Sequence, residues 1–164
     1  MPAGRTLRTL QSVSLYRSSV RLPLTCPFIR ICELQADTIV RRYPDMRIAS
    51  LRLSWSVPSR SDAERQDSNV RKRDLWGYVQ EDAAADAFIL AATDESGQWC
   101  GHEAFFITAP SVAAAEDVDI LRQIYYPEVP WLVKEGKHVS HQTGFFDCGK
   151  AERLMGWVHR DALS

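Results

Sequence analysis

The feature that most constrains this chain is an amphipathic helix that a proline ends and an alternating strand follows. Five apolar residues recur at helical spacing and form one stripe: Cys32, Ala36, Ile39, Val40 and Tyr43. Pro44 disfavours a helical conformation in the residue before it and so ends the helix. Residues 47–53 (RIASLRL) then alternate apolar and polar side chains with the period of a strand. A helix, a short turn and a strand in this order are half of a βαβ unit, which predicts an α/β fold.

Further helices and strands are predicted along the chain. The pattern indicates a short aromatic strand at 75–79, an alanine-rich helix at 81–92, a buried strand at 103–108 and a helix at 113–126. The polar residues 54–73 predict a long connection with one exposed helix near 62–71. Asp147 is expected to cap a last short helix, which Gly156 and Trp157 end and anchor.

The charges divide the chain into two regions. The first acidic residue is Glu33, so residues 1–32 carry five arginines and no acid, while the whole chain has a net charge of −1. We therefore expect a basic leader at 1–30 that is disordered or not native to the fold, and a structured region at 31–164. An organellar transit peptide is the alternative for the leader, although Pro23 and Pro27 would interrupt its helix.

Length and composition exclude several classes. The 164 residues are 45% apolar and 25% charged, which is typical of one globular domain. The balanced charge gives no reason to expect nucleic acid as a partner. No stretch approaches the roughly 18 apolar residues of a membrane span, so we expect no membrane insertion. The expected location is cytoplasmic, with the mitochondrion as the alternative that the basic leader would imply.

The cysteines and histidines do not form a metal-binding pattern. The four cysteines contain no C-x-x-C pair, and we expect them to be reduced thiols. His138 and His141 are close in sequence, as are Cys100 and His102, but a metal would need the two pairs to meet. We therefore expect no metal site.

The usual self-contained catalytic motifs are missing as well. No two glycines have G-x-G or G-x-x-G spacing, so no glycine-rich turn is available to cradle a pyrophosphate. The sequence also contains no G-x-S-x-G elbow and no H-E-x-x-H helix. The motifs thus identify neither a nucleotide-binding turn nor a hydrolase.

Four segments between residues 31 and 161 nevertheless resemble one known family. They are residues 47–53 (RIASLRL), 75–82 (LWGYVQED), 102–110 (HEAFFITAP) and 146–157 (FDCGKAERLMGW). In this order and at this spacing they resemble the C-terminal half of the NAD-dependent epimerase/dehydratases, which are extended short-chain dehydrogenase/reductases. The last segment is the most specific, since the family has a similar D-x-x-K-A-x-x-x-L-G-W run in a helix of its substrate lobe.

The resemblance implies a partial Rossmann-like, doubly wound α/β fold in which the first βαβ units are missing. What is left is the C-terminal strands and a small α/β substrate-binding lobe. It also implies chemistry, namely hydride transfer with NAD or NADP at a carbonyl or hydroxyl of a small molecule or sugar nucleotide. The family's dinucleotide fingerprint is not found here, and no tyrosine is followed four positions later by the family's lysine. Because this acid and this cofactor cradle are both missing, we expect no turnover and no bound NAD or NADP from this chain alone.

The resemblance also implies site residues. Ser54, Trp55 and Val57 would lie in the loop beside the nicotinamide, and four residues would flank the substrate: Arg73, Trp76, Tyr78 and Gln80. Trp55, the aromatic segment at 76–80 and Arg73 each have a structural alternative, because aromatic residues beside a strand are often core and a basic run is often solvated. Asp82 is expected to cap a helix and not to catalyse.

Two functions follow as hypotheses. The first is a truncated epimerase/dehydratase-like protein that is inactive by itself and belongs to a family acting on small-molecule substrates. The alternative is a non-catalytic binding or dimerisation module, which would use the apolar face left uncovered where the rest of a doubly wound sheet should lie. In that case the Cys32 to Tyr43 stripe would be partly exposed and could support self-association.

Overall fold

The computed structural model describes residues 25–129 and 144–160 of the chain. The helices are α1 (Thr25–Arg42), α2 (Arg60–Glu64), α3 (Ser68–Arg73), α4 (Glu81–Thr93), α5 (Val118–Tyr125) and α6 (Gly149–Met155). The strands are β1 (Ile48–Leu53), β2 (Trp55–Val57), β3 (Tyr78–Gln80) and β4 (His102–Ile107). Residues 1–24, which make up most of the expected leader, lie outside the described residues, as do His138 and His141.

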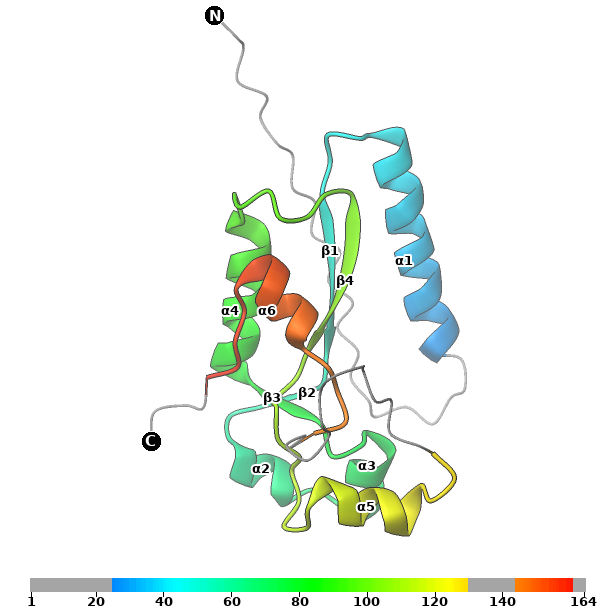
Figure 1. Cartoon of the computed structure of the whole chain (residues 1–164), viewed down its shortest axis with the longest axis vertical. Coiled ribbons are helices and arrows are strands. Elements are labelled where there is room, and N and C mark those ends of the chain that lie inside the picture. Colours follow the sequence, from blue (N-terminus) through cyan, green and yellow to red (C-terminus); the bar gives the residue numbers. More distant parts are fainter. Residues whose placement is uncertain (1–24, 130–143, 161–164) are drawn as a thin grey trace, which may run out of the picture.

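The chain has a mixed α/β fold with small parallel sheets, as the helix and strand pattern predicted. β1 pairs in parallel with β4, from Ile48 opposite His102 to Leu53 opposite Ile107. β2 pairs in parallel with β3 in a second two-stranded sheet. Figure 1 shows α1 on one side of the β1–β4 pair and α4 with α6 on the other, while α2, α3 and α5 lie with β2 and β3 at one end of the molecule.

The apolar core lies between the sheet and the α4 and α6 helices. Phe105 of β4 and Ala87 of α4 are fully buried there, and Leu51 of β1 is almost so. The run of alanines on α4 presents little side-chain volume, which lets the helix approach the strands closely. Trp157 is buried in the same cluster, and its indole Nε1 donates a hydrogen bond to the carbonyl of Ala83 at 2.9 Å. The C-terminal segment is therefore locked onto α4.

The α1 side of the sheet is held mainly by polar contacts. Arg52 of β1 donates two hydrogen bonds to the Glu33 carboxylate, each 2.7 Å long. His102 of β4 hydrogen-bonds through Nδ1 to Asp37 at 2.8 Å. Of the predicted stripe only Ala36 is buried, Val40 is half-buried, and three residues are exposed: Cys32, Ile39 and Tyr43. The partial exposure that was predicted is confirmed. The bonds of Glu33 and Asp37 connect α1 to the strands, although the Asp37 side chain remains 43% exposed.

Three helix boundaries differ from the predictions. α1 begins at Thr25 rather than Ile31, since Pro27 falls in the first turn of the helix, where a missing N–H costs nothing. The helix therefore crosses position 30, where the sequence placed the end of the leader. The single helix expected near 62–71 is two short ones, because Asp67 caps the second by accepting from the backbone N–H groups of Asn69 and Val70. The helix expected at 113–126 is confined to α5, which Asp117 caps.

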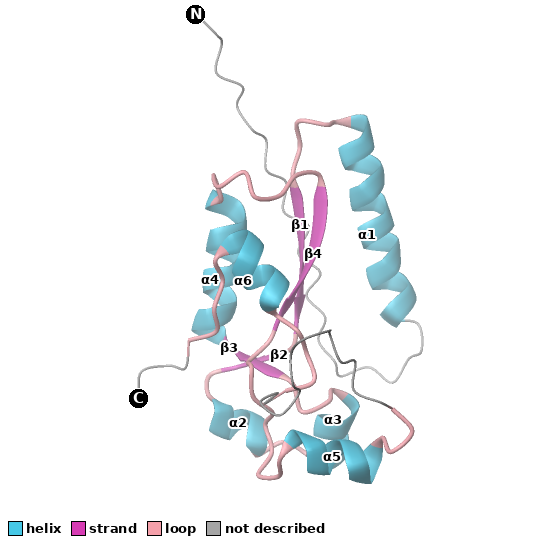
Figure 2. Ribbon diagram, in the orientation of Figure 1, coloured by secondary structure: helices cyan, strands magenta, loops and turns pink. Residues whose placement is uncertain are grey.

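The remaining predicted elements are present, and Figure 2 shows where each helix and strand lies. Gly156 ends α6 in a left-handed conformation, with φ of 69°, as a glycine after a helix is expected to do. Asp147 accepts a hydrogen bond from the Gly149 N–H at 2.9 Å, but the N-cap residue of α6 is Cys148, so the cap predicted at Asp147 lies one residue too early. Leu75 and Trp76 have positive φ, each 52°, and this sharp turn joins α3 to β3. The strand predicted at 75–79 therefore begins only at Tyr78.

Candidate functional site

The carboxyl ends of β1 and β4 lie side by side, as the register of the parallel pair requires. Ser54 follows β1 and Thr108 follows β4; their hydroxyl groups hydrogen-bond to each other, and the Ser54 N–H donates to the Ile107 carbonyl at 3.2 Å. Ligands of open α/β sheets bind at this edge, because the loops that leave it can diverge around a crevice. This edge is therefore the first place to look for a site.

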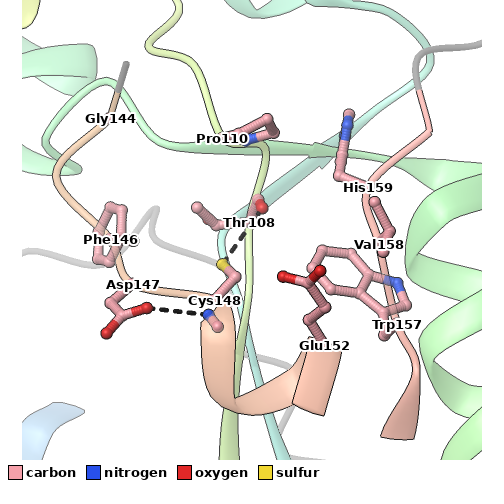
Figure 3. Close-up of a pocket in the computed structure, with 11 residues that line it drawn as sticks. Thr108, Pro110, Gly144, Phe146, Asp147, Cys148, Glu152, Trp157, Val158 and His159 are labelled. Atoms are coloured by element: carbon pink, nitrogen blue, oxygen red, sulfur yellow. Dashed lines mark hydrogen bonds between the residues drawn. The ribbon is translucent and has the colours of Figure 1, made fainter. Parts of the chain in front are cut away.

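A cavity of about 310 Å³ opens beside Thr108 (Figure 3). Its lining residues come from the segment after β4, from the start of α6 and from the segment after α6. They are Thr108, Pro110, Gly144, Phe146, Asp147, Cys148, Gly149, Glu152, Trp157, Val158 and His159. Figure 3 shows Cys148 and Glu152 between Phe146 on one side and Trp157 on the other. The volume of this cavity lies at the lower end of the range of small-molecule pockets.

Hydrogen bonds within the chain hold the lining in place. The Cys148 thiol donates to the Thr108 carbonyl at 3.4 Å, which ties the start of α6 to the end of β4. Burial raises the pKa of this thiol. Since the thiolate is the nucleophilic form of cysteine, Cys148 is poorly suited to covalent catalysis and acts as a structural contact.

The cavity offers mostly hydrogen-bond acceptors and aromatic surface. Asp147 and Glu152 contribute carboxylates, His159 contributes an imidazole, and Phe146 and Trp157 contribute rings. No lysine or arginine is among the residues that line the cavity. Such a lining suits a ligand with hydroxyl or other donor groups on an apolar frame, because carboxylates accept from donors and rings pack on the frame.

Two glycines allow the segments around the cavity to approach closely. A Cβ on Gly144 would lie 2.6 Å from the Pro110 carbonyl oxygen, and both residues line the cavity. A Cβ on Gly77 would lie 2.7 Å from the ring of Phe146 and 3.0 Å from Ser54 Oγ. A larger residue at either position would displace Pro110 or Phe146 and so change the shape of the cavity.

The predicted cofactor residues are divided between two environments. Ser54 lies at the carboxyl edge beside Thr108, as expected for a residue near a ligand. Trp55 is half-buried, and it packs on a cluster that contains Val57, which is only 3% exposed. Val57 therefore contributes to the core of the β2–β3 region.

Three of the four predicted substrate residues are buried. Tyr78 is completely buried, and its hydroxyl hydrogen-bonds to Ser111 at 3.2 Å. Trp76 packs with Tyr125 and Phe145, and Gln80 is 4% exposed.

The fourth, Arg73, is exposed at the end of α3. None of the seven predicted cofactor and substrate residues lines the cavity beside Thr108. In this structure Trp76, Tyr78 and Gln80 have the packing role that was their structural alternative, and Val57 also belongs to a buried cluster.

The sequence did not single out the residues that do line the cavity as ligand contacts. Trp157 was interpreted as an anchor and has this role in addition to lining the cavity, whereas Asp147, interpreted as the helix cap, precedes the N-cap residue Cys148 and also lines the cavity. The available signal was positional. Thr108 directly follows a buried strand, and a polar residue at the carboxyl end of a parallel strand is a candidate for ligand contact.

A second polar cluster lies on the α1 side of the sheet. Ser50 Oγ is 2.8 Å from His102 Nε2, and His102 Nδ1 is 2.8 Å from Asp37. These distances match those of a nucleophile, a base and an orienting carboxylate. Ser50 is only 5% exposed, so a substrate cannot reach its hydroxyl, and the cluster connects α1 to the sheet. In the sequence, His102 and Cys100 formed a close pair of possible metal ligands. In the structure both ring nitrogens of His102 are hydrogen-bonded, one to Ser50 and the other to Asp37.

Within the described ranges, no group of three or more His, Cys, Asp or Glu side chains could hold a metal ion. In the same residues no helix combines the length and the apolar character needed to cross a membrane. No family model matches the chain, and neither the curated proteins nor the solved structures contain a significant match to it.

Proposed function

We propose that this chain binds a small molecule in the cavity beside Thr108, as the C-terminal part of an NAD-dependent epimerase/dehydratase-like, partial Rossmann fold. The observation that carries the proposal is the position of the cavity. It lies at the carboxyl end of a parallel strand pair, where the segments after β4 and around α6 converge. The last of the four family-like segments, residues 146–157, supplies much of its lining.

The proposed role is binding and not turnover. Residues 1–164 contain neither the glycine-rich turn nor the Tyr-x-x-x-Lys pair of the family, so proton transfer coupled to hydride transfer has no acid and no cofactor cradle. NAD or NADP is therefore the family's cofactor and not an expected ligand of this chain alone. The proposed ligand is the family's substrate class, a hydroxyl- or carbonyl-bearing small molecule.

The experiment is a titration of isotope-labelled protein followed by amide chemical shifts. The probes are NAD, NADP, UDP-glucose, UDP-galactose and the free sugars glucose and galactose. We expect at least one substrate-class compound to shift the amides of Thr108, Gly149 and Glu152, and we expect NAD and NADP to shift none of them. Phe146→Ala should weaken the binding, whereas Ile124→Ala, on the exposed face of α5, should not. If no substrate-class compound shifts the amides around the cavity, the proposal is wrong.

A second candidate function has its own observation. The side of α1 that faces away from the sheet exposes five large apolar side chains: Phe28, Ile31, Leu34, Ile39 and Tyr43. Exposed apolar residues that follow one another along a helix are typical of an interaction surface. We propose that this surface, the outer face of α1, binds another protein chain or a second copy of this one.

Sedimentation velocity at increasing protein concentration tests the self-association branch of this second candidate. A concentration-dependent dimer that Leu34→Ser abolishes would support it. A monomer at every concentration would overturn self-association through the outer face of α1 and leave only binding to another protein.

A further inference from the structure

One acid in the cavity beside Thr108 has no partner within the described part of the chain. Glu152 is exposed on α6, and Figure 3 shows its carboxylate pointing into the cavity, toward the side where Thr108 and His159 lie. Among residues 25–129 and 144–160, no group forms a hydrogen bond or an ion pair with this carboxylate. Its negative charge is therefore available to a ligand.

The other polar groups that line the cavity bring no positive charge to Glu152. His159 Nε2 accepts a hydrogen bond from the Gln80 backbone N–H at 3.5 Å, and only an unprotonated ring nitrogen can accept. None of the described residues that line the cavity is a lysine or an arginine. A ligand that neutralises Glu152 must therefore carry the positive charge itself.

Asp147, the second acid of the lining, is already engaged within the chain. The Gly149 N–H donates to its carboxylate at 2.9 Å. A Cβ on Gly149 would lie 3.0 Å from Asp147 Oδ1 and 3.3 Å from Arg153 Nη1, so both side chains lie beside this glycine. Arg153 thus offsets the charge of Asp147, and it is not among the residues that line the cavity. Glu152 is the acid that remains for a ligand.

The aromatic rings and the limited space narrow the class of ligand. Figure 3 shows Glu152 between Phe146 and Trp157, and the face of an aromatic ring attracts a cation. The volume of about 310 Å³ is that of about ten water molecules at roughly 30 Å³ each, which suits a single sugar ring better than a sugar nucleotide. A diphosphate would also bring its negative charge to Glu152 without a basic residue in the lining to bind it.

We propose that the cavity beside Thr108 takes a small hydroxylated primary amine, bound as its ammonium ion by Glu152 and the two rings, and not a sugar nucleotide. This rests on the proposed function, binding in this cavity, and names its substrate class. The hydroxyl groups of such a compound suit the acceptors of the lining. The ammonium ion adds the charge that an uncharged sugar lacks.

Three matched pairs of compounds test the proposal on the full chain, by amide chemical shifts at pH 7. Each pair compares an amine with the compound in which a hydroxyl replaces it: glucosamine with glucose, galactosamine with galactose, and glucamine with sorbitol. We expect at least one amine to shift the amides of Thr108, Gly149 and Glu152 with an affinity about three- to fivefold higher than that of its hydroxyl partner, because a single exposed ion pair contributes modestly. The difference should shrink between 50 and 300 mM salt, and UDP-glucose should not shift these amides.

Matched variants assign the preference to one side chain. Glu152→Gln should remove the preference for the amine over its hydroxyl partner. Glu95→Gln is the control, because it makes the same change of charge at an exposed residue that does not line the cavity, and it should keep the preference. Circular dichroism confirms that both variants fold.

The outcomes separate this inference from the proposed function. If no amine binds more tightly than its hydroxyl partner, or if Glu152→Gln keeps the preference, the inference is wrong, while binding of the sugars still supports the proposed function. Tighter binding of UDP-glucose than of glucosamine overturns the inference in the same way. If none of these compounds shifts the amides around the cavity, both the inference and the proposed function are wrong.

Discussion

Replacing Asp94 with alanine should cause one of the largest losses of stability available in this chain. Arg47, just before β1, and Asp94, just after α4, form a buried ion pair with side chains 10% and 7% exposed. The Arg47 Nη1 atom is 2.6 Å from the Asp94 carboxylate, and Nη2 donates to the Asp94 carbonyl. The guanidinium also lies over the Trp99 ring, 4.7 Å from its centroid. The substitution removes the counter-charge and leaves the cation buried.

The magnitude follows from that unpaired charge. Removing one partner of a buried ion pair costs about 3–5 kcal/mol, because the remaining charge has lost its water and gained nothing in exchange. In a domain of this size each kcal/mol lowers the melting temperature by roughly 2–4 °C, so we expect a fall of roughly 6–20 °C. The double variant Arg47→Met/Asp94→Ala should recover part of the lost stability, because it also removes the unpaired cation and places an apolar side chain against Trp99.

The assay is urea unfolding followed by tryptophan fluorescence, with Asp86→Ala as the matched control. Asp86 pairs with Arg160 at the surface, where the two side chains are 30% and 72% exposed. An exposed pair contributes about 0–1 kcal/mol, so this variant should unfold close to the wild type. If Asp94→Ala costs no more than Asp86→Ala, or if the double variant is less stable than Asp94→Ala alone, the reasoning is refuted.

Three further predictions concern titration, reactivity and the cavity. Hydrogen bonds from Arg52 hold the pKa of Glu33 below its usual value of 4.5. This contact therefore stabilises the fold above that pH, and its contribution to the free energy of unfolding disappears as the pH falls below it. Glu33→Gln should remove this contribution to the loss of stability that unfolding curves show between pH 7 and 3. Because burial raises the pKa of Cys148, iodoacetamide at pH 7.5 should alkylate the exposed Cys32 and Cys100 before Cys148, as peptide mass spectrometry would show. Gly144→Ala should abolish the ligand-induced amide shifts around the cavity, since its Cβ would meet a backbone carbonyl 2.6 Å away, and unchanged shifts would contradict the assigned site.

The predicted elements that were confirmed are those whose pattern is local. β1 and β4 have the period or the apolar run of strands, α4 has its alanines and acidic first turn, and Gly156 ends α6. Each of these depends on backbone preferences and on neighbours within a few residues. The errors also have local causes, since Asp67 caps a new helix within the polar connection, where a single exposed helix was expected.

The candidate site was less accessible to sequence reasoning. Tyr78 and Trp76 occupy a segment that resembles a substrate cleft, but both are buried. Trp76 packs against Val118 and Leu121 of α5, and Tyr78 lies in a second cluster with Val57 and Ala63. Aromatic residues give the same sequence pattern in a core and in a binding site, and only their neighbours in space distinguish the two. The lining of the cavity comes from segments as far apart as Thr108 and His159, which no spacing rule connects.

By itself, the sequence determined the alternation of helices and strands, the missing glycine-rich turn and the concentration of positive charge before Glu33, because these depend on residue type and short spacing. Only the tertiary structure decided which side of α1 faces the sheet. Ala36 of the apolar stripe does face the sheet, but Glu33 and Asp37 bind Arg52 and His102 on β1 and β4, and these contacts leave Cys32, Ile39 and Tyr43 exposed. The physical reason is that partners this distant in sequence meet only through the pairing of β1 with β4, and their contacts outweigh a weak local preference.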